Sequence, residues 1–570
     1  ATARGRRTLA YRLTAPGPLR LGHFLLGSMR VERDFQYAGR HRDSLGADFV
    51  VPELARLADT LERLAPAVRR AHLALLGARS VAALRARLRP AVSLVRGSAR
   101  WRLRVEKPSF DGRNHLVLTI RGDVRASRAS LADDVLTVVP RAGRDTVILD
   151  VEIATDGAPL TPLDRTAIFN DRFRRFADSA RTPRLEREIR GFELLSSREK
   201  LMAGLPNFAT YFGRDMLMTA LLMEPVWADT MPEFVIAAAL AKLSPSGEVS
   251  HEEALGGQAI REHAAEYLRT GDPRWLRDIA ETRENYLMVD DDFQLPVVAA
   301  RYLADPGVTD ARKRRFLERH IERLLANLSF VARQADAYAR DPVATNLVSF
   351  RRLPDGWWHA GSWRDSRVGY AGGRFAFDVN VVWVPAALRA MAAIDSALRA
   401  LGFTGVPEVR NGFQVAAEHA WRDVARHFWV ALAPAEVETR VRARLAALPA
   451  AERTHWEAVL ARSGVPADTL RFPALALDSA GRPIPIMSTD PAMWLLLERQ
   501  GPARERQLLA PFLLPYPVGL LIEGLGPVAA NAAYAAPAVW EMFERDRYHS
   551  PRVVWGREVK VLLAAVAPRG

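Results

Sequence analysis

The sequence predicts a mainly helical protein in which a toroid of helical hairpins follows a smaller β-rich domain. Two observations support this prediction. Before about residue 156, short segments alternate apolar and polar residues with the period of two that is typical of strands. After about residue 186, apolar residues recur every three or four positions in about a dozen segments. So many helices, joined in pairs by long loops, suit a toroid better than a small bundle.

The β-rich domain is expected to span residues 1–156 and to form a sandwich. One interval, Pro52 to Val95, interrupts it, because Leu, Ala and Val recur there at helical spacing among arginines. We therefore predict a helical insertion, and we find no catalytic set of side chains in this domain. The predicted strands are Leu19–Phe24, Arg100–Val105, His115–Arg121, Val135–Pro140 and Thr146–Ile153.

Residues 157–185 contain Pro159, Pro162 and Pro183 and are predicted to be a linker, followed by the helical domain at 186–570. Thr230 is expected to cap a helix that begins at Pro232. The other expected helices are Pro183–Ala203, Gln258–Leu268, Pro273–Leu287, Pro296–Leu303, Asp310–Ala339, Val379–Leu401, Phe413–Leu432, Ala435–Arg462 with a break near Pro449, Pro491–Glu498, Pro537–Arg545 and Pro551–Val566.

Composition excludes several function classes. The net charge of +14 comes mostly from arginines spread along the whole chain, so we expect no nucleic-acid partner. No uncharged apolar run is long enough to predict a membrane span. The absence of cysteine excludes disulfides, thiol nucleophiles and cysteine-based metal sites. The numbered chain begins at Ala1 without an initiator Met, and we favour a bacterial periplasmic or secreted location over the cytoplasm. The oligomeric state is open.

The stretch Gly356–Ser366 gathers three tryptophans and a carboxylate. Trp357, Trp358 and Trp363 can offer flat apolar faces, and Asp365 can offer a proton. A sugar ring and its glycosidic oxygen need aromatic platforms beside a titratable carboxylate. The alternative is that these tryptophans are core residues and that Asp365 caps a turn.

A second stretch, Gly204 to Asp215, leads from an aromatic loop into the apolar segment Met216–Met223. Arg214 can donate in a planar fork and Asp215 can accept, so the pair suits adjacent sugar hydroxyls. A structural ion pair at a helix start is the alternative.

These stretches carry a family resemblance. Gly-Leu-Pro-x-Phe with Phe-Gly-Arg-Asp (204–215), Gly-Ser-Trp-Arg-Asp-Ser (361–366) and Asp-Val-Asn-Val-Val-Trp (378–383) together resemble the (α/α)6-barrel glycoside hydrolases. The resemblance is closest to the glucosidase domain of glycogen-debranching enzymes, in a wider group with glucoamylases and trehalases. It covers about residues 190 to 567 and keeps the motif order. It implies that Arg214 and Asp215 bind the terminal sugar and that Asp365 is the general acid.

Further residues are expected to line the same site. His251 and Glu252 follow a glycine-containing turn, where this family often places a substrate-facing histidine. Three consecutive carboxylates at 290–292 cannot all point at one ion, so they predict a helix start or a rim, and we expect no metal or other cofactor. Asp490 is expected to cap a helix. The remaining substrate-binding candidates are Phe212, Arg364, Tyr548, His549 and Trp555.

A hydrolase of this kind needs a second carboxylate, about 6.5 to 9.5 Å from the first for inversion and about 5 to 5.5 Å for retention. We rank Glu541 first, because it precedes Tyr548 as the family's base precedes a tyrosine-containing segment, although its context is Trp-Glu-Met and not Pro-Glu-Leu. Glu523 lies on a glycine-rich loop and ranks second. Glu558 ranks third, since a buried pair with Arg557 would also explain it.

The sequence therefore predicts an inverting, exo-acting glycoside hydrolase with Asp365 as acid and a C-terminal glutamate as base. The resemblance implies an α-linked glucoside or oligosaccharide as its substrate. Two alternatives stay open. A polysaccharide lyase would use Tyr548, His549 or His251 as base and leave an unsaturated product. A non-catalytic carbohydrate-binding protein would bind glycans without turnover.

Overall fold

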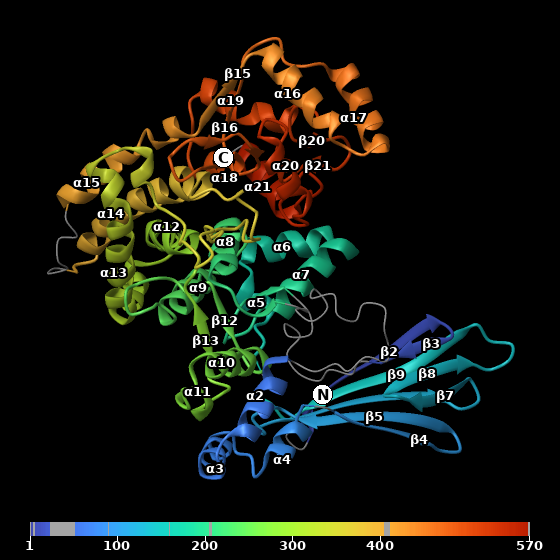
Figure 1. Ribbon diagram of the computed structural model, residues 1–570. Coiled ribbons are helices and arrows are strands. Elements are labelled where there is room, and N and C mark those ends of the chain that lie inside the picture. The colour runs from blue at the N-terminus through green and yellow to red at the C-terminus, as the bar shows by residue number, and fades with distance from the viewer. Residues whose placement is uncertain are drawn as a thin grey trace. The chain divides into compact units, whose positions relative to one another are not determined.

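A computed structural model describes residues 2–3, 6–22, 52–88, 90–158, 160–204, 208–403 and 411–567 (Figure 1). The chain divides into two compact units, each built from separate stretches of sequence. Unit 1 comprises Ala1–Leu163, Gly191–Tyr211 and Glu253–Glu284, and unit 2 comprises Asp164–Arg190, Phe212–Glu252 and Asn285–Gly570. Most of the range predicted as a linker is structured and belongs to unit 2, where it forms α5 (Arg165–Ile168) and α6 (Asp171–Ala180).

Two antiparallel sheets form the β-rich part of unit 1. Among the described residues, the strand order is β1-β2-β9-β6-β5-β4 in the larger sheet and β3-β8-β7 in the smaller one. The predicted N-terminal sheet region is thus confirmed, while Phe24, the predicted end of its first strand, lies outside the described residues. The strands are β1 Thr2–Ala3, β2 Arg6–Pro16, β3 Leu19–Leu21, β4 Ala91–Arg96, β5 Arg100–Pro108, β6 His115–Asp123, β7 Ser127–Ala132, β8 Val135–Pro140 and β9 Thr146–Thr155.

The core shared by these sheets follows from the period of two. In β5, Trp101, Leu103 and Val105 are buried, and the arginines between them are exposed or half-buried. The indole of Trp101 donates to Ser127 Oγ at 3.0 Å. Its ring lies against Gly122, its partner across the ladder, where a Cβ would come within 2.3 Å of the indole. Glycine at this position therefore makes room for the largest side chain of the core.

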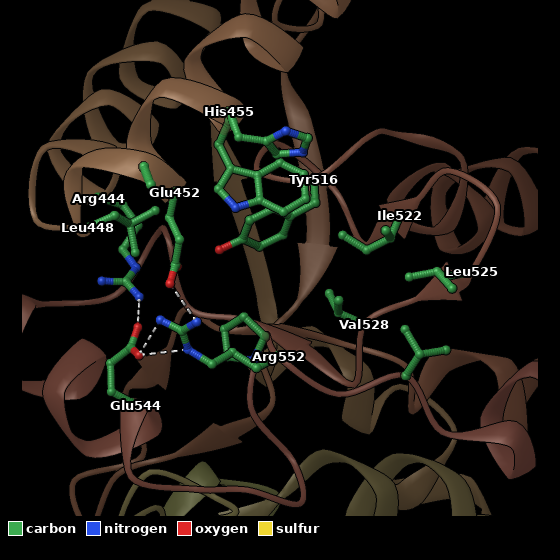
Figure 2. Close-up of a pocket in the computed structure, with 14 residues that line it drawn as sticks. Arg444, Leu448, Glu452, His455, Tyr516, Ile522, Leu525, Val528, Glu544 and Arg552 are labelled. Carbon is green, nitrogen blue, oxygen red and sulfur yellow. Dashed lines mark hydrogen bonds and ion pairs between the residues drawn. The ribbon is translucent and has the colours of Figure 1, made fainter.

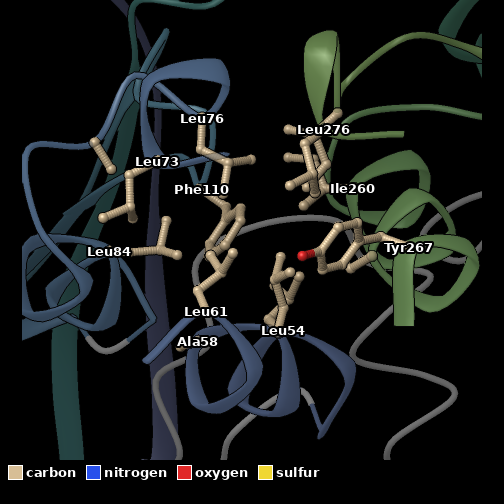
Figure 3. Packing of buried hydrophobic residues seen from close by; sticks show 14 of the residues in the cluster. Leu54, Ala58, Leu61, Leu73, Leu76, Leu84, Phe110, Ile260, Tyr267 and Leu276 are labelled. Atoms are coloured by element: carbon tan, nitrogen blue, oxygen red, sulfur yellow. The ribbon is translucent and has the colours of Figure 1, made fainter. Parts of the chain in front are cut away.

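The helical insertion has a second core of its own (Figure 3). Its helices are α2 (Pro52–Arg63), α3 (Pro66–Leu75) and α4 (Val81–Ala86), and α4 begins where Ser80 Oγ accepts from the backbone N–H of Ala83. Helices α10 (Gly257–Thr270) and α11 (Arg274–Arg277), from the middle of the chain, complete the cluster with Ile260, Tyr267 and Leu276. The insertion ends at residue 86, earlier than predicted, because β4 begins at Ala91.

Unit 2 holds most of the remaining helices and several short strands. The helices that follow α6, apart from α10 and α11, are α7 Pro183–Leu195, α8 Gly213–Met223, α9 Thr230–Ala241, α12 Asp290–Ala304, α13 Asp310–Arg340, α14 Val384–Ala400, α15 Asn411–Trp421, α16 Pro434–Ala446, α17 Ala450–Ser463, α18 Pro491–Leu497, α19 Pro502–Leu513, α20 Pro537–Glu544 and α21 Gly556–Val566, with the π-helix η2 Asp378–Trp383 and the 3-10 helices η1 Ala344–Asn346 and η3 Val424–His427. The later strands of the chain, of which β10 and β11 belong to unit 1, are β10 Met202–Gly204, β11 Phe208–Tyr211, β12 Glu252–Ala254, β13 Arg283–Asn285, β14 Phe375–Ala376, β15 Trp429–Leu432, β16 Leu470–Pro473, β17 Ala476–Leu477, β18 Pro483–Ile484, β19 Met487–Ser488, β20 Leu521–Ile522, β21 Gly526–Pro527 and β22 Ala530–Asn531.

The prediction of an (α/α)6 toroid is wrong. The fold is mixed, with 47% helix and 20% strand, and the strands form several small sheets. The helices range from 4 to 31 residues, and α12 packs against α8, α9, α13 and α14. Helical periodicity located most helices but could not show how they assemble. The apolar faces of α10 and α11, expected in the toroid, are buried on the helical insertion of unit 1.

Several element boundaries also differ from expectation. The expected helix Pro273–Leu287 is only the four residues of α11, followed by β13. Helix α19 was not predicted. Thr230 is the first residue of α9 rather than its cap. The stretch Asp378–Ala400 is long and apolar enough to cross a membrane, but 67% of its apolar window is buried within the protein, which is typical of a core helix.

Leu61, which is fully buried in α2, tests the second core of unit 1 (Figure 3). We expect Leu61→Ala to lower the free energy of unfolding by about 2 to 5 kcal/mol, because it leaves a cavity among close-packed side chains. Val68→Ala, at an exposed site of α3, is the control and should change it by less than about 0.5 kcal/mol. Denaturant unfolding measures both, and equal effects would contradict this packing.

Candidate active site

The loop 361–366 of unit 2 is fixed by one buried carboxylate. The indole Nε1 of Trp363 donates to Asp490 Oδ1 at 2.9 Å, and Arg364 Nη2 donates to the same oxygen at 3.0 Å. Arg364 also donates to Thr489 Oγ1 and to the carbonyl of Ala529. Both side chains of the Arg364–Asp490 pair are 0% exposed. The prediction that Arg364 binds substrate is therefore wrong, and Asp490 holds this loop instead of capping α18, which has no side-chain cap.

Trp363 is a packing residue and not an open platform. The guanidinium groups of Arg364 and Arg557 lie over its ring, 4.2 and 4.9 Å from the centroid. The rings of His549 and Trp555 meet it edge-on at 5.4 and 6.5 Å. With its ring covered and 9% of the residue exposed, Trp363 does not fit the predicted stacking on a sugar.

The other two predicted platforms, Trp357 and Trp358, are half-buried. Trp357 Nε1 donates to the carbonyl of Arg367 at 2.9 Å. The guanidinium of Arg374 lies 4.8 Å from the ring centre of Trp358. These contacts hold both rings in place and leave part of each ring exposed.

Arg214, in the first turn of α8, joins the predicted site residues. Its Nη2 donates to Asp365 Oδ2 at 2.7 Å and lies 3.5 Å from His251 Nε2, and its Nη1 lies 3.5 Å from Asp290 Oδ1. Burial lowers the pKa of Arg214, but Asp290, Asp365 and Asp215 outweigh burial and raise it, so the group stays charged. The Arg214 side chain is 9% exposed and that of Asp365 is 42% exposed. The pair therefore has one buried and one solvent-facing partner.

His251 lies on the inner side of Arg214. Its Nδ1 is 3.4 Å from Asp291 Oδ2, and its ring meets Phe212 edge-on at 5.8 Å. The backbone N–H of Gly213 donates to the His251 carbonyl at 2.7 Å, which ties His251 to the start of α8. The structure thus brings Phe212, Arg214, His251 and Asp365 together. Asp215 is exposed and Glu252 is half-buried beside them in the sequence.

The three carboxylates at 290–292 form the first turn of α12, so the predicted helix start is the placement that the structure shows. They are buried and do not form the rim that was predicted as the alternative. Burial raises the pKa of Asp290 against the opposing effect of Arg214, and burial raises that of Asp292. Among the described residues, Asp290 Oδ1, both oxygens of Asp291, Arg214 Nη1 and His251 Nδ1 have no hydrogen-bond partner. Four of these atoms face one another at ion-pair distance: Arg214 Nη1 lies 3.5 Å from Asp290 Oδ1, and His251 Nδ1 lies 3.4 Å from Asp291 Oδ2.

Arg214 and His251 lie at ion-pair distance from two of these carboxylates, those of Asp290 and Asp291. In the part of the chain that the structure describes, no three His, Asp or Glu side chains are placed so that they could hold a metal ion.

His359 is a site residue that the sequence analysis missed. Burial lowers the pKa of His359, and the charge of Asp365 opposes that shift, so the two side chains are near each other. Its Nδ1 is buried without a hydrogen-bond partner among the described atoms. Its position in the tryptophan-rich stretch was the available signal, but we gave it no role.

The residue that follows Asp365 joins this loop to the C-terminal segment. Ser366 Oγ donates to Asp546 Oδ2 at 2.7 Å and lies 3.0 Å from His549 Nδ1. Burial acts to raise the pKa of Asp546, but hydrogen bonds from His549, the Tyr548 backbone and Ser366 lower it to about 2. The ring of His549 is buried and stacks on Trp555 at 6.2 Å. His549 and Trp555 thus support the loop, while Tyr548 is exposed.

The three glutamates proposed as base differ in exposure. Glu541 and Glu523 are exposed, whereas Glu558 is 4% exposed and lies 3.5 Å from Arg557. The buried pair offered as the alternative for Glu558 is therefore present. A general base must contact water, which favours the exposed glutamates. Glu541 belongs to α20, which ends two residues before Asp546.

Comparison with known proteins adds nothing to this geometry: no family model, curated protein or solved structure matches the chain. Of the first motif behind the family resemblance, residues 205–207 lie outside the described part of the chain, so that resemblance depends on the sequence alone.

Asp378 should make the stability of the folded protein depend on pH. It accepts from Ser362 Oγ at 2.5 Å and Tyr370 Oη at 2.9 Å, and burial and the nearby Asp490 raise its pKa to about 7. The folded chain therefore keeps a proton that the unfolded chain, with a pKa of about 3.9, loses. The free energy of unfolding should fall as the pH rises from about 4 to 7, and then level off.

Asp378→Asn removes this titration. We expect its free energy of unfolding, relative to wild type, to increase by on the order of 1 kcal/mol per pH unit between about pH 4 and 7 and then to stay constant. Denaturant unfolding at pH 5, 6, 7 and 8 measures the difference. Asp355→Asn is the control, because Trp357 N–H and Arg367 lower the pKa of Asp355, so it does not titrate in this range. A flat difference for Asp378→Asn would contradict the assignment.

Breaking the Arg364–Asp490 pair should destabilise unit 2. We expect Arg364→Met to lower the free energy of unfolding by about 3 to 5 kcal/mol, because it leaves a buried carboxylate without its partner. Arg367→Met, three residues later, removes an exposed pair with Asp355 and should cost less than about 1 kcal/mol. Similar unfolding midpoints for the two variants would show that Asp490 does not need Arg364.

Proposed function

We propose that this protein is a glycoside hydrolase in which Asp365 transfers the proton to the leaving oxygen. The observation that carries this proposal is the Arg214–Asp365 pair, with its buried cation and its solvent-facing carboxylate. Such a pair can exchange its internal hydrogen bond for bonds to two neighbouring hydroxyls, as the terminal sugar of an oligosaccharide would require. We expect an α-linked glucoside as substrate, on the family resemblance alone.

Substrate binding can also change the partner of the acid. In the free protein, Arg214 Nη2 donates to Asp365 Oδ2 at 2.7 Å. When sugar hydroxyls accept the Arg214 donors, Asp365 loses this partner. A carboxylate that loses a cationic partner binds a proton more readily, and a general acid needs that proton.

Glu541 is our first candidate for the base. It is exposed and can activate a water, and the hydrogen bond from Ser366 to Asp546 ties the segment after α20 to the residue after Asp365. Inversion would require the two carboxyl groups to lie about 6.5 to 9.5 Å apart, with a water between them. Glu523 is the next candidate, and burial places Glu558 last.

One observation favours a second candidate, a non-catalytic carbohydrate-binding protein. The Asp365 carboxyl group that Arg214 holds can accept hydrogen bonds from hydroxyls without any transfer of a proton. The lyase alternative is weaker, because His251 and His549 are buried and paired with aspartates, which leaves Tyr548 as its exposed base.

Asp365→Asn tests the proposal. We expect kcat on the best substrate of a panel of α- and β-linked oligosaccharides to fall about 10²- to 10⁴-fold, because the general acid is lost. Reducing-sugar release and NMR of the new anomer give rate and stereochemistry, with inversion expected. Asp355→Asn, an exposed carboxylate ten residues earlier, is the matched control and should keep full activity.

Other outcomes decide among the alternatives. Turnover that survives Asp365→Asn would contradict the assigned acid. Binding without turnover by the wild type would support the binding protein, and an unsaturated product would support the lyase. Glu541→Gln, Glu523→Gln and Glu558→Gln then identify the base by the largest loss of kcat.

A further inference from the structure

Unit 2 contains a pocket that shares no residue with the candidate active site (Figure 2). It has a volume of about 540 Å³ and lies among α16, α17, the β20–β21 hairpin and residues 544–554. This volume falls in the range of ordinary ligand pockets. Neither the proposed acid nor any candidate base lines it.

Four alternating charges form one side of this pocket. Arg552 Nε donates to Glu544 Oε2 and Arg552 Nη1 donates to Glu452 Oε1, both at 2.9 Å, and Arg444 also pairs with Glu544. Figure 2 shows these bonds as a continuous chain from Arg444 to Glu452. Two cations and two anions leave this side without net charge. They present fixed donors beside fixed acceptors.

Aromatic and aliphatic side chains form the rest of the wall. Trp456 and Tyr516 meet at 4.7 Å with their rings 72° apart, and His455 meets Trp456 at 4.6 Å. Burial raises the pKa of Tyr516, and the four charged side chains also act on its hydroxyl, so that hydroxyl lies near them. Leu525, 71% exposed, stands at the open side. The aliphatic lining is Leu448, Ala451, Ile522, Leu525, Val528 and Val554.

From this combination we propose that the pocket binds a neutral sugar ring, as a second carbohydrate site. A charged ligand would find no net opposite charge. A purely apolar ligand would remove water from four charges without replacing its hydrogen bonds. A sugar ring offers an apolar face to Trp456 and hydroxyls that can donate to Glu452 and accept from Arg552. The inference goes beyond the proposed function, and it stands whether or not Asp365 is catalytic.

Binding of maltotetraose and cellotetraose to the full chain tests this proposal. We measure the isotherms calorimetrically in an Asp365→Asn background, which prevents consumption of the probes. Two binding components are expected, one at each site. Trp456→Ala and Glu452→Gln should each weaken one component at least about tenfold, because they remove the stacking face and an acceptor. Glu457→Gln, an exposed neighbour on α17 outside the pocket, is the matched control and should change neither.

The outcomes separate the two proposals. Trp456→Ala should leave kcat on a small aryl glucoside unchanged, because Trp456 lies outside the candidate active site. Absence of turnover by the wild type would therefore contradict the proposed hydrolase and not the proposed sugar site in this pocket. Isotherms unaffected by both Trp456→Ala and Glu452→Gln would overturn the pocket proposal, as would no binding of either probe at millimolar concentration. Binding of 1-octanol in this pocket, with no binding of either sugar there, would show an apolar ligand and overturn the proposal too. Thermal unfolding confirms that each variant is folded.

Discussion

The buried carboxylate of Asp490 is the constraint on which the site depends. Taking an Arg–Asp pair out of water is costly, and here Trp363, Arg364 and the groups around them offset the cost with hydrogen bonds. Once residues 363 and 364 are held inside, the next side chain must point away. Asp365 therefore reaches Arg214, and Ser366 reaches the C-terminal segment. The Arg364–Asp490 pair therefore positions the side chains of Asp365 and Ser366 as well as stabilising the fold.

The electrostatics of the site follow from the same burial. A single guanidinium, Arg214, stands among Asp290, Asp365 and His251, with more negative than positive charge close by. Arg214 Nη1 lies 3.5 Å from Asp290 Oδ1, and His251 Nδ1 lies 3.4 Å from Asp291 Oδ2, so these buried groups hold one another by charge. Preorganised polar groups of this kind are what a binding or catalytic site needs.

Sequence patterns predicted local structure better than assembly. The strand β5 and the long helix α13 could be predicted from the sequence, because the pattern of each depends on residues that are close together in the chain. The toroid failed, because the small sheets and the burial of α10 depend on distant residues. For the site, the motifs behind the family resemblance named Arg214, His251 and Asp365, and the structure places these side chains near one another. The motifs could not show that Arg364 is buried or that Trp363 is covered, since Asp490 lies more than a hundred residues away.

The second core of unit 1 has a consequence for how the chain matures. Leu54, Leu61 and Phe110 are covered by Ile260 and Leu276, which are synthesised about 150 residues after Phe110. On the ribosome, this apolar surface stays uncovered until α10 and α11 emerge, and by then part of unit 2 has already been made. The apolar core of the helical insertion is therefore complete only once residue 279 has been made, whereas the core between the two sheets is built from residues before 152.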